Sequence, residues 1–208
     1  SGQSLNRIDF TRIDQSARAL NYQGTSTSEL AALLSRQANS EAEKARIIYS
    51  WLAYHIAYDV QGFVSGNYGD LSPVGVLTSR KAVCSGYANL YEALARHMDL
   101  ETSIVEGYAK GVSYATGKEA KVNHAWNGVK IDNQWYLVDA TWGAGTVDNQ
   151  QFNPQFNPHY FATPPEQFIY DHLPVKEQWQ LLSQPYSQNQ FESLPNISAQ
   201  FFKSGLST

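Results

Sequence analysis

Cys84 is the only cysteine in the chain, and it stands at the start of a predicted helix. A thiol attacks as the thiolate, and its ordinary pKa is about 8.5. The unpaired N–H groups and the dipole of a helix N-terminus favour a negative charge, and those N–H groups can also stabilise an oxyanion. Ser85 and Gly86 are small, so we expect a substrate carbonyl to reach the sulfur. The alternative is a buried cysteine that serves only as a small apolar side chain.

A reactive thiol needs a base, and the chain has five histidines. His55 and His97 fall in predicted helices, and His55 shares a helical stripe with apolar side chains, which indicates a core histidine. His159 and His172 lie in a loop-rich segment. His124 opens a predicted strand, and it is therefore the favoured base.

The strand that begins at His124 is joined to the next strand by a predicted two-residue turn at positions 132–133. This register puts Trp126 opposite Asp139, so His124 lies on the same face of the hairpin, diagonal to Asp139. A long side chain spans the diagonal distance of about 7–8 Å between the backbones. We therefore expect Asp139 to orient the His124 imidazole, unless an extra residue bulges the hairpin. A carboxylate that only caps the following loop is the alternative.

The periodicity of the sequence predicts a helix-led half followed by clustered antiparallel strands, which is an α+β fold. Ser28, Ser40 and Ser72 are predicted N-caps, and Ser40 and Glu43 fit a capping box. Predicted helices or helical turns cover about 14–20, 28–34, 40–56, 73–77, 85–98 and 165–170. Predicted strands cover 102–108, 124–131, 135–141 and 159–161. The segments 59–72 and 111–121 are predicted polar loops.

Three blocks of the sequence resemble the transglutaminase-like superfamily, whose members share a papain-like fold. They are IYSWLAYHIAYDV at 48–60, VCSGYANLYEAL at 83–94 and NHAWNGVKIDNQWYLVDATWGAG at 123–145. A fourth block, HYFATPPEQFIYDHLP at 159–174, is similar to the branch that contains the kyphoscoliosis peptidase and the fungal cytokinesis proteins. The resemblance covers about 45–182, and the order Cys, His, Asp with these spacings is specific to the superfamily.

The resemblance implies a papain-like α+β fold with an antiparallel sheet, in which Cys84 is the nucleophile, His124 the base and Asp139 the residue that orients the base. It also divides the chain into a helical extension at 1–40, a catalytic domain at 41–182 and a tail at 183–208 that packs on the domain or begins a further segment. The implied chemistry is acyl transfer from amide bonds through a thioester, with a protein or peptide as substrate.

The acceptor of the acyl group is not determined by these three residues. Water would make the chain a peptidase or amidase, which we favour, and an amine would make it a transglutaminase. A non-catalytic module that binds a peptide or glycan on the same fold is the third possibility. Tyr58 and Trp51 are candidates for the oxyanion side chain, although core packing is the alternative for Trp51. Ser85 and Trp126 are further candidates for the cleft.

Composition excludes other classes of function. The net charge of −4 and the pI of about 5.7 argue against a nucleic-acid surface, which needs clustered Lys and Arg. No apolar run approaches the ~18 residues of a membrane span. A single cysteine forms no intramolecular disulfide, and no cluster at ligand spacing predicts a metal site or a cofactor. The location is open, with export favoured by a small margin over the cytoplasm, and the sequence does not indicate an oligomeric state.

Overall fold

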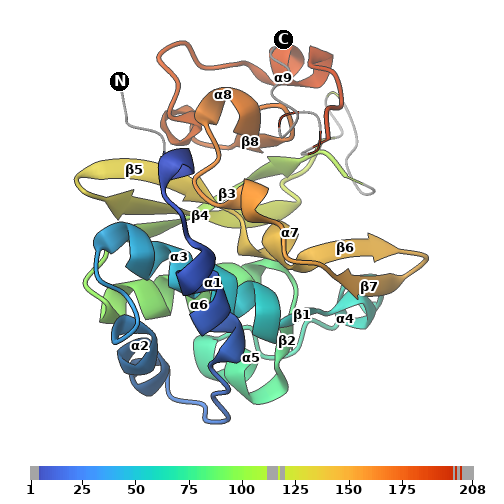
Figure 1. The fold of residues 1–208 in the computed structure, drawn as a ribbon. Coiled ribbons are helices and arrows are strands. Elements are labelled where there is room, and N and C mark those ends of the chain that lie inside the picture. The colour runs from blue at the N-terminus through green and yellow to red at the C-terminus, as the bar shows by residue number, and fades with distance from the viewer. Residues whose placement is uncertain (1–4, 112–116, 118–119, 199, 201, 203–208) are drawn as a thin grey trace.

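The computed structural model describes residues 5–111, 117, 120–198, 200 and 202, and these form the predicted α+β fold (Figure 1). Most helices gather on one side of a central sheet, and the C-terminal segment lies on its other side. The described helices and 3-10 helices are η1 (Leu5–Arg7), α1 (Thr11–Ala19), α2 (Thr27–Ser35), α3 (Glu41–His55), α4 (Val60–Ser65), α5 (Pro73–Ser79), α6 (Cys84–His97), α7 (Ala140–Ala144), η3 (Pro158–Tyr160), α8 (Pro165–Phe168), η4 (Glu177–Gln180) and α9 (Gln188–Ser193).

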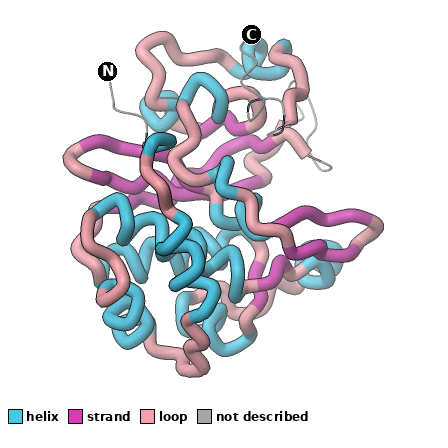
Figure 2. Tube along the Cα trace, viewed as in Figure 1, coloured by secondary structure: helices cyan, strands magenta, loops and turns pink. Residues whose placement is uncertain are grey.

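The central sheet is antiparallel, with the strand order β5-β4-β3-β8 (Figure 2). β1 and β2 form a short parallel pair, while β6 and β7 form a separate hairpin that projects from the body. The described strands are β1 (Ala57–Tyr58), β2 (Lys81–Ala82), β3 (Thr102–Ala109), β4 (His124–Ile131), β5 (Gln134–Val138), β6 (Gly145–Asp148), β7 (Gln151–Pro154) and β8 (His172–Pro174).

Serine side chains cap the helices that open the fold. Ser40 and Ser72 each accept a hydrogen bond from the first turn of α3 and α5, as predicted. The N-cap of α2 is Ser26 rather than Ser28, so that prediction was wrong by half a turn. Glu43 accepts from the backbone N–H of the residue before Ser40, so only half of the predicted capping box forms.

The central helix α6 packs its apolar face against β3 and β4. Tyr87, Leu90, Tyr91 and Leu94 recur at helical spacing and are almost completely buried. Each such side chain contributes roughly 1.5–3 kcal/mol of burial free energy. The two tyrosine hydroxyls donate to backbone carbonyls of neighbouring chain segments, which satisfies the polar atoms that this packing buries.

The hairpin of β4 and β5 has the predicted two-residue turn. Ile131 pairs with Gln134, and Asp132 and Asn133 have φ values of 49° and 67°. Two consecutive positive φ values are the pattern of a type I′ turn, which matches the twist of the two strands. The predicted register is therefore confirmed. The returning strand ends at Val138, earlier than predicted, because the chain turns there into α7.

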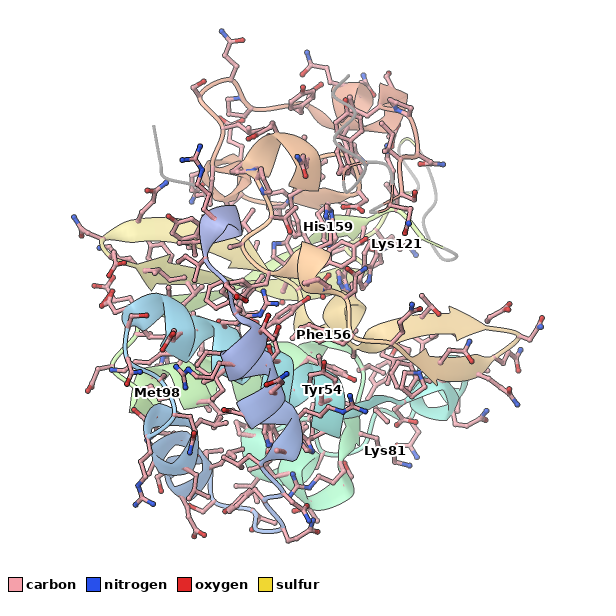
Figure 3. The ribbon with its side chains drawn as sticks, viewed as in Figure 1. Tyr54, Lys81, Met98, Lys121, Phe156 and His159 are labelled. Carbon is pink, nitrogen blue, oxygen red and sulfur yellow. The ribbon has the colours of Figure 1, made fainter. Side chains whose placement is uncertain are left out.

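The N-terminal helix α1 is joined to α3 through a partly buried ion pair. Arg46 donates to both carboxylate oxygens of Asp14 at 2.8 Å, and Ser50 donates to the same carboxylate at 2.5 Å. The segment after β7 also packs on α3, where Phe156 stacks on Tyr54 with a ring separation of 4.8 Å (Figure 3). The first two helices thus share one hydrophobic core with α3 and α6.

The C-terminal segment completes the sheet and adds a small second cluster. β8 pairs with β3, and α9 contributes the buried Phe191, which packs with Ile169 and Leu173. Residues 159–161, predicted as a strand, belong mainly to the 3-10 helix η3, and Phe161 makes only an isolated bridge to Val138. The predicted loop at 111–121 lies mostly outside the described residues.

Within the part of the chain that the structure describes, no helix combines the length and the apolar character that a membrane crossing requires.

Candidate active site

Cys84 is the first residue of α6, and its half-buried side chain lines a broad cleft. The parallel pair of β1 and β2 brings the chain to this helix, with Ala82 two residues before the thiol. His124 and Ala125 line the same cleft and interact with the thiol. The thiol therefore lies near the first residues of β4.

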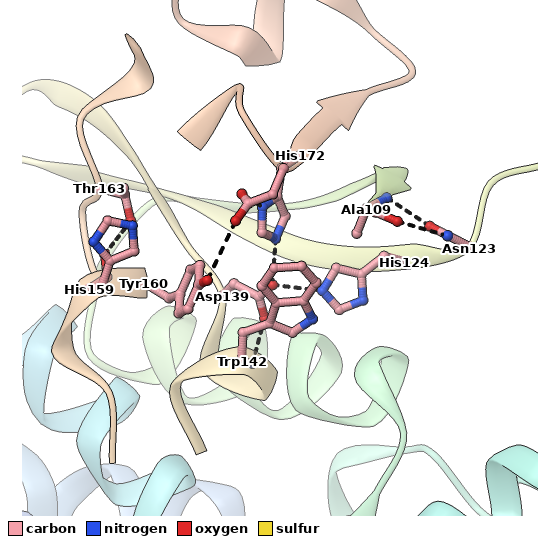
Figure 4. Close-up of polar contacts among 10 residues, drawn as sticks. Ala109, Asn123, His124, Asp139, Trp142, His159, Tyr160, Thr163 and His172 are labelled. Carbon is pink, nitrogen blue, oxygen red and sulfur yellow. Dashed lines mark hydrogen bonds and ion pairs between the residues drawn. The ribbon is translucent and has the colours of Figure 1, made fainter. Parts of the chain in front are cut away.

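His124 is the first residue of β4, and two hydrogen bonds made by the side chain of the preceding residue hold this end of the strand in place. Asn123 accepts from the Ala109 N–H at 2.8 Å and donates to the Ala109 carbonyl at 3.0 Å, so it ties the start of β4 to the end of β3 (Figure 4). The His124 ring is buried, with the rings of Trp126 and Trp142 centred 5.7 and 5.6 Å away. Neighbouring aromatic rings thus restrict the orientation of the imidazole.

Asp139 is completely buried and uses both carboxylate oxygens. Oδ2 accepts a hydrogen bond of 2.6 Å from His124 Nε2–H. Oδ1 accepts from the Trp142 N–H at 3.1 Å, so Asp139 is also the N-cap of α7. Its own backbone N–H donates to the Tyr160 carbonyl at 2.9 Å. Since His124 Nε2 lies against Asp139, Nδ1 is the ring nitrogen left for an interaction with Cys84.

The electrostatics of this group favour a thiolate–imidazolium pair. Burial opposes charge on Cys84, but the hydrogen bond to His124, its positive charge and the Ala125 N–H together hold the pKa of the thiol below its ordinary value. Burial likewise opposes charge on His124, but the charge of Asp139 and the bonds to Asp139 and Cys84 raise the pKa of His124 to about 10. Burial also opposes charge on Asp139, but His124 and His172 hold its pKa well below the usual range.

A second histidine reaches the same carboxylate. His172 of β8 is completely buried, and its Nε2–H donates to Asp139 Oδ2 at 2.7 Å. Its Nδ1–H donates to Asp171 Oδ1 at 2.5 Å. Sequence analysis placed His172 in a loop-rich segment and assigned it no part in the site. The one sequence feature that pointed to His172 was the adjacent pair Asp171-His172, which lies in the block 159–174 that resembles the superfamily.

His124, Asp139 and His172 also form a group whose ligand atoms lie within 4.8 Å of one another. The spacing of these residues in the sequence did not predict such a cluster. A metal ion would need the lone pairs of both Nε2 atoms, yet each Nε2 carries the proton of a short hydrogen bond to Asp139. The donor set therefore fits a hydrogen-bonded network rather than a metal centre.

The family of the chain follows from comparison with known proteins. The model of the transglutaminase-like superfamily matches residues 28–140, which is more than half of the chain. The chain belongs to the transglutaminase-like superfamily. The cysteine, histidine and aspartate described above all lie within the matched segment, so the site belongs to the part that this chain shares with the superfamily.

Relatives within the superfamily include the branch that the sequence resembles. The mouse kyphoscoliosis peptidase is 36% identical over 201 residues, which cover 95% of this chain and 30% of that protein. Cytokinesis protein 3 of Schizosaccharomyces pombe is 24% identical over 217 residues, which cover 99% of this chain and 24% of that protein. The chain thus spans less than a third of the length of these relatives.

One of the solved structures to which this chain is similar is the periplasmic domain of TgpA from Pseudomonas aeruginosa. It superimposes with a TM-score of 0.43 at 19% identity, over 65% of this chain and 49% of that chain.

The four other predicted site residues of this transglutaminase-like chain divide into two pairs. Tyr58 and Ser85 line the cleft with Cys84, and burial, with a smaller effect from the charge of Cys84, raises the pKa of Tyr58. Trp51 and Trp126 do not line it. Trp51 is completely buried and donates its indole N–H to the Leu20 carbonyl, so it packs in the core.

Trp126 lies beneath the site rather than in the cleft, so its predicted place was wrong. The side chain is 1% exposed and contacts Phe168 and His172 with its ring. Its indole nitrogen is buried and has no hydrogen-bond partner among the described residues, so it does not face a bound oxyanion. An inward-facing position on β4 sends this side chain into the core next to His124.

Gly86 was predicted to give a substrate access to the sulfur, but its small size serves close packing instead. It is buried in the first turn of α6, and a Cβ atom on it would lie 2.5 Å from the Cβ of Ala82. Glycine therefore allows α6 to pack closely on the strand that precedes Cys84. Only Ser85 of the two small residues lines the cleft.

Proposed function

We propose that this chain catalyses thiol-dependent acyl transfer at amide bonds of a protein or peptide, and that water is the acceptor, so that it acts as a cysteine peptidase or amidase. One observation carries the proposal. Cys84, whose thiol is half-buried, and His124 line the same cleft and interact electrostatically, and the His124 ring is hydrogen-bonded to the buried Asp139. This is the nucleophile, base and orienting carboxylate that a thiol enzyme requires.

In the first half of the reaction, the Cys84 thiolate forms a bond to the carbonyl carbon of the amide. The carbonyl oxygen takes the negative charge and is stabilised by the N–H groups of the first turn of α6. The carbon–nitrogen bond then breaks, and His124 Nδ1 gives its proton to the leaving amine. Asp139 keeps the ring in the orientation that points Nδ1 at the reacting atoms.

In the second half, His124 takes a proton from water, and the resulting hydroxide attacks the thioester. The carbon–sulfur bond breaks, the carboxylic acid leaves, and Cys84 returns as the thiolate beside the protonated His124. A primary amine at the same step would yield a new amide and make the chain a transglutaminase. Hydrolysis needs no second binding site for an acceptor, and the name of the mouse relative, 36% identical, agrees with a peptidase.

The test compares the acceptors directly. Fluorescent casein is incubated with the chain, with and without a fluorescent primary amine, and the products are analysed by mass spectrometry. We expect the unmodified chain to release casein fragments with free carboxyl ends, and the Cys84→Ala variant to release none. Amine incorporation without cleavage would assign the chain to the transglutaminases. Binding of casein peptides with no product of either kind would favour a non-catalytic module.

A further inference from the structure

His172 is held between two carboxylates in the interior of the molecule. Its side chain is completely buried, with Nε2 2.7 Å from Asp139 Oδ2 and Nδ1 2.5 Å from Asp171 Oδ1 (Figure 4). An ionised carboxylate only accepts hydrogen bonds. Both ring nitrogens must therefore donate, and a histidine that donates from both nitrogens is the imidazolium.

The surroundings of His172 fix its ring in this position. Phe168 stacks on the ring at 3.9 Å with an interplanar angle of 17°, and Trp126 meets it edge-on at 5.0 Å. Trp142 lies on another side at 4.5 Å. Burial among such rings lowers the pKa of His172, because it opposes a charged imidazole. The charges and hydrogen bonds of Asp171 and Asp139 outweigh this effect, so the pKa of His172 is raised.

Charged and titratable groups approach this position from every element around it. Asp139 comes from the end of β5, His124 from β4, and Asp171 precedes β8. Tyr160 of η3 donates to the other oxygen of Asp171 at 3.4 Å. Lys110 interacts electrostatically with Asp171, and His159 interacts electrostatically with both Asp171 and His172.

The two histidines compete for one oxygen atom. His124 Nε2–H and His172 Nε2–H both donate to Asp139 Oδ2, and their ring centroids are 5.6 Å apart. We propose that His172 is a positioning residue of the catalytic centre: held as the imidazolium between Asp171 and Asp139, it fixes the Asp139 carboxylate and weakens the hold of Asp139 on the proton of His124. This inference rests on the proposed function, in which His124 must release that proton.

The sign of the effect follows from electrostatics. A positive charge near His124 disfavours the imidazolium form of His124 and favours its release of a proton to the leaving amine. Without the charge of His172, the proton would be bound more tightly, and protonation of the leaving group would become less favourable. His172 thus adjusts the acidity of His124 toward the pH at which the reaction proceeds.

The first test uses the unmodified chain and needs neither activity nor a variant that folds. Nuclear magnetic resonance of ¹⁵N-labelled histidine rings at pH 8 reports whether each ring nitrogen carries a proton. We expect both nitrogens of His172 to be protonated at this pH. One unprotonated nitrogen on His172 at pH 8 would overturn the inference.

The second test measures the pKa of His124 in a Cys84→Ala background, where no thiolate affects the ring. His172→Gln keeps a donor toward Asp139 but removes the charge, and at a ring separation of 5.6 Å we expect the pKa of His124 to rise by about one to two pH units. Asp171→Asn, at a less buried position, removes the carboxylate that keeps His172 protonated. We expect it to raise the pKa of His124 as well, by a smaller amount. His55→Gln is the matched control and should leave the pKa of His124 unchanged.

An unchanged or lower pKa of His124 in both variants would overturn the inference. If His172→Gln does not fold, Asp171→Asn and the measurement on the unmodified chain still decide it. Failure of the proposed function would look different, because it would appear as an inert Cys84 in the unmodified chain. That outcome does not affect the protonation of His172 or the shift of His124.

Discussion

The two sides of the cleft differ in how their side chains are held. On the sheet side, His124 lines the cleft and Asp139 and His172 lie behind it. All three are at most 9% exposed, and hydrogen bonds to Asp139 link them. On the other side, α4 and the β6–β7 hairpin contribute apolar side chains that are about half exposed, such as Phe63 and Val147, both 46% exposed. The proposed reacting groups thus lie in a hydrogen-bonded interior, whereas the other side, the open wall, presents exposed apolar side chains to the cleft.

This difference implies that chemistry and recognition are separable. A fully hydrogen-bonded buried network has one arrangement, and loss of any partner leaves a buried polar group unsatisfied. Exposed apolar side chains have no such partners to lose, and they gain free energy only when a ligand covers them. Substitutions on the sheet side should therefore change the rate, and substitutions on the open wall should change affinity.

The largest effect is expected for Cys84→Ala. Removal of the nucleophile should lower turnover by at least about 10⁴-fold, because the other groups act only through the thiol. Thermal unfolding should be nearly unchanged, since alanine fits the first position of α6. Hydrolysis of a peptide substrate and the melting temperature are the two measurements. Activity equal to that of the unmodified chain would refute the enzymatic account of the cleft.

Asp139→Asn comes next. The amide removes the negative charge that holds the His124 imidazolium, and we expect kcat to fall by about 10²- to 10⁴-fold with a small change in KM. Steady-state kinetics separate the two parameters. Asp132→Asn, at the turn of the same hairpin, is the matched control and should have normal kinetics. If both variants were equally active, the carboxylate would only cap α7.

Tyr58→Phe should have a smaller effect. Tyr58 lines the cleft beside Cys84, and the charge of Cys84 affects its pKa. If the hydroxyl donates to the oxyanion, its loss should lower kcat by about 10- to 100-fold with KM unchanged, at or below the usual value for one such donor. An unaltered kcat would leave the oxyanion to the backbone N–H groups of α6 alone.

The smallest effect is expected on the open wall. Phe63→Ala should raise KM by about three- to tenfold with kcat unchanged, because only part of the ring is free to be covered by a substrate. Val74→Ala removes a somewhat more exposed apolar side chain that does not line the cleft, and it is the control. A fall in kcat with a constant KM would mean that the two walls are not separable.

Sequence was sufficient where local patterns decide the structure. The apolar spacing after Cys84 predicts α6, and the turn at Asp132 fixes the register of the β4–β5 hairpin, which is confirmed. These two elements bring Cys84, His124 and Asp139 to one place. Their catalytic roles are predictions that the kinetic experiments test.

Sequence was insufficient where distant segments decide the structure. His172 lies in a three-residue strand without periodicity, and its pairing with β3 is set by contacts far apart in the chain. The β6–β7 hairpin turns at Asn149 and Gln150, which have positive φ but lack the glycine that usually marks such a turn. The burial of Trp126 depends on what covers both faces of the sheet, which strand alternation does not reveal.

The central claim is that Cys84 and His124 form an ion pair, and the pH dependence of alkylation tests it most directly. The rate of reaction with iodoacetamide, followed by intact mass, reports the fraction of thiolate. We predict reaction with an apparent pKa well below the ordinary thiol value of about 8.5, and a higher apparent pKa in His124→Ala. A thiol that is inert at neutral pH, or one with an ordinary pKa that His124→Ala leaves unchanged, would contradict the account.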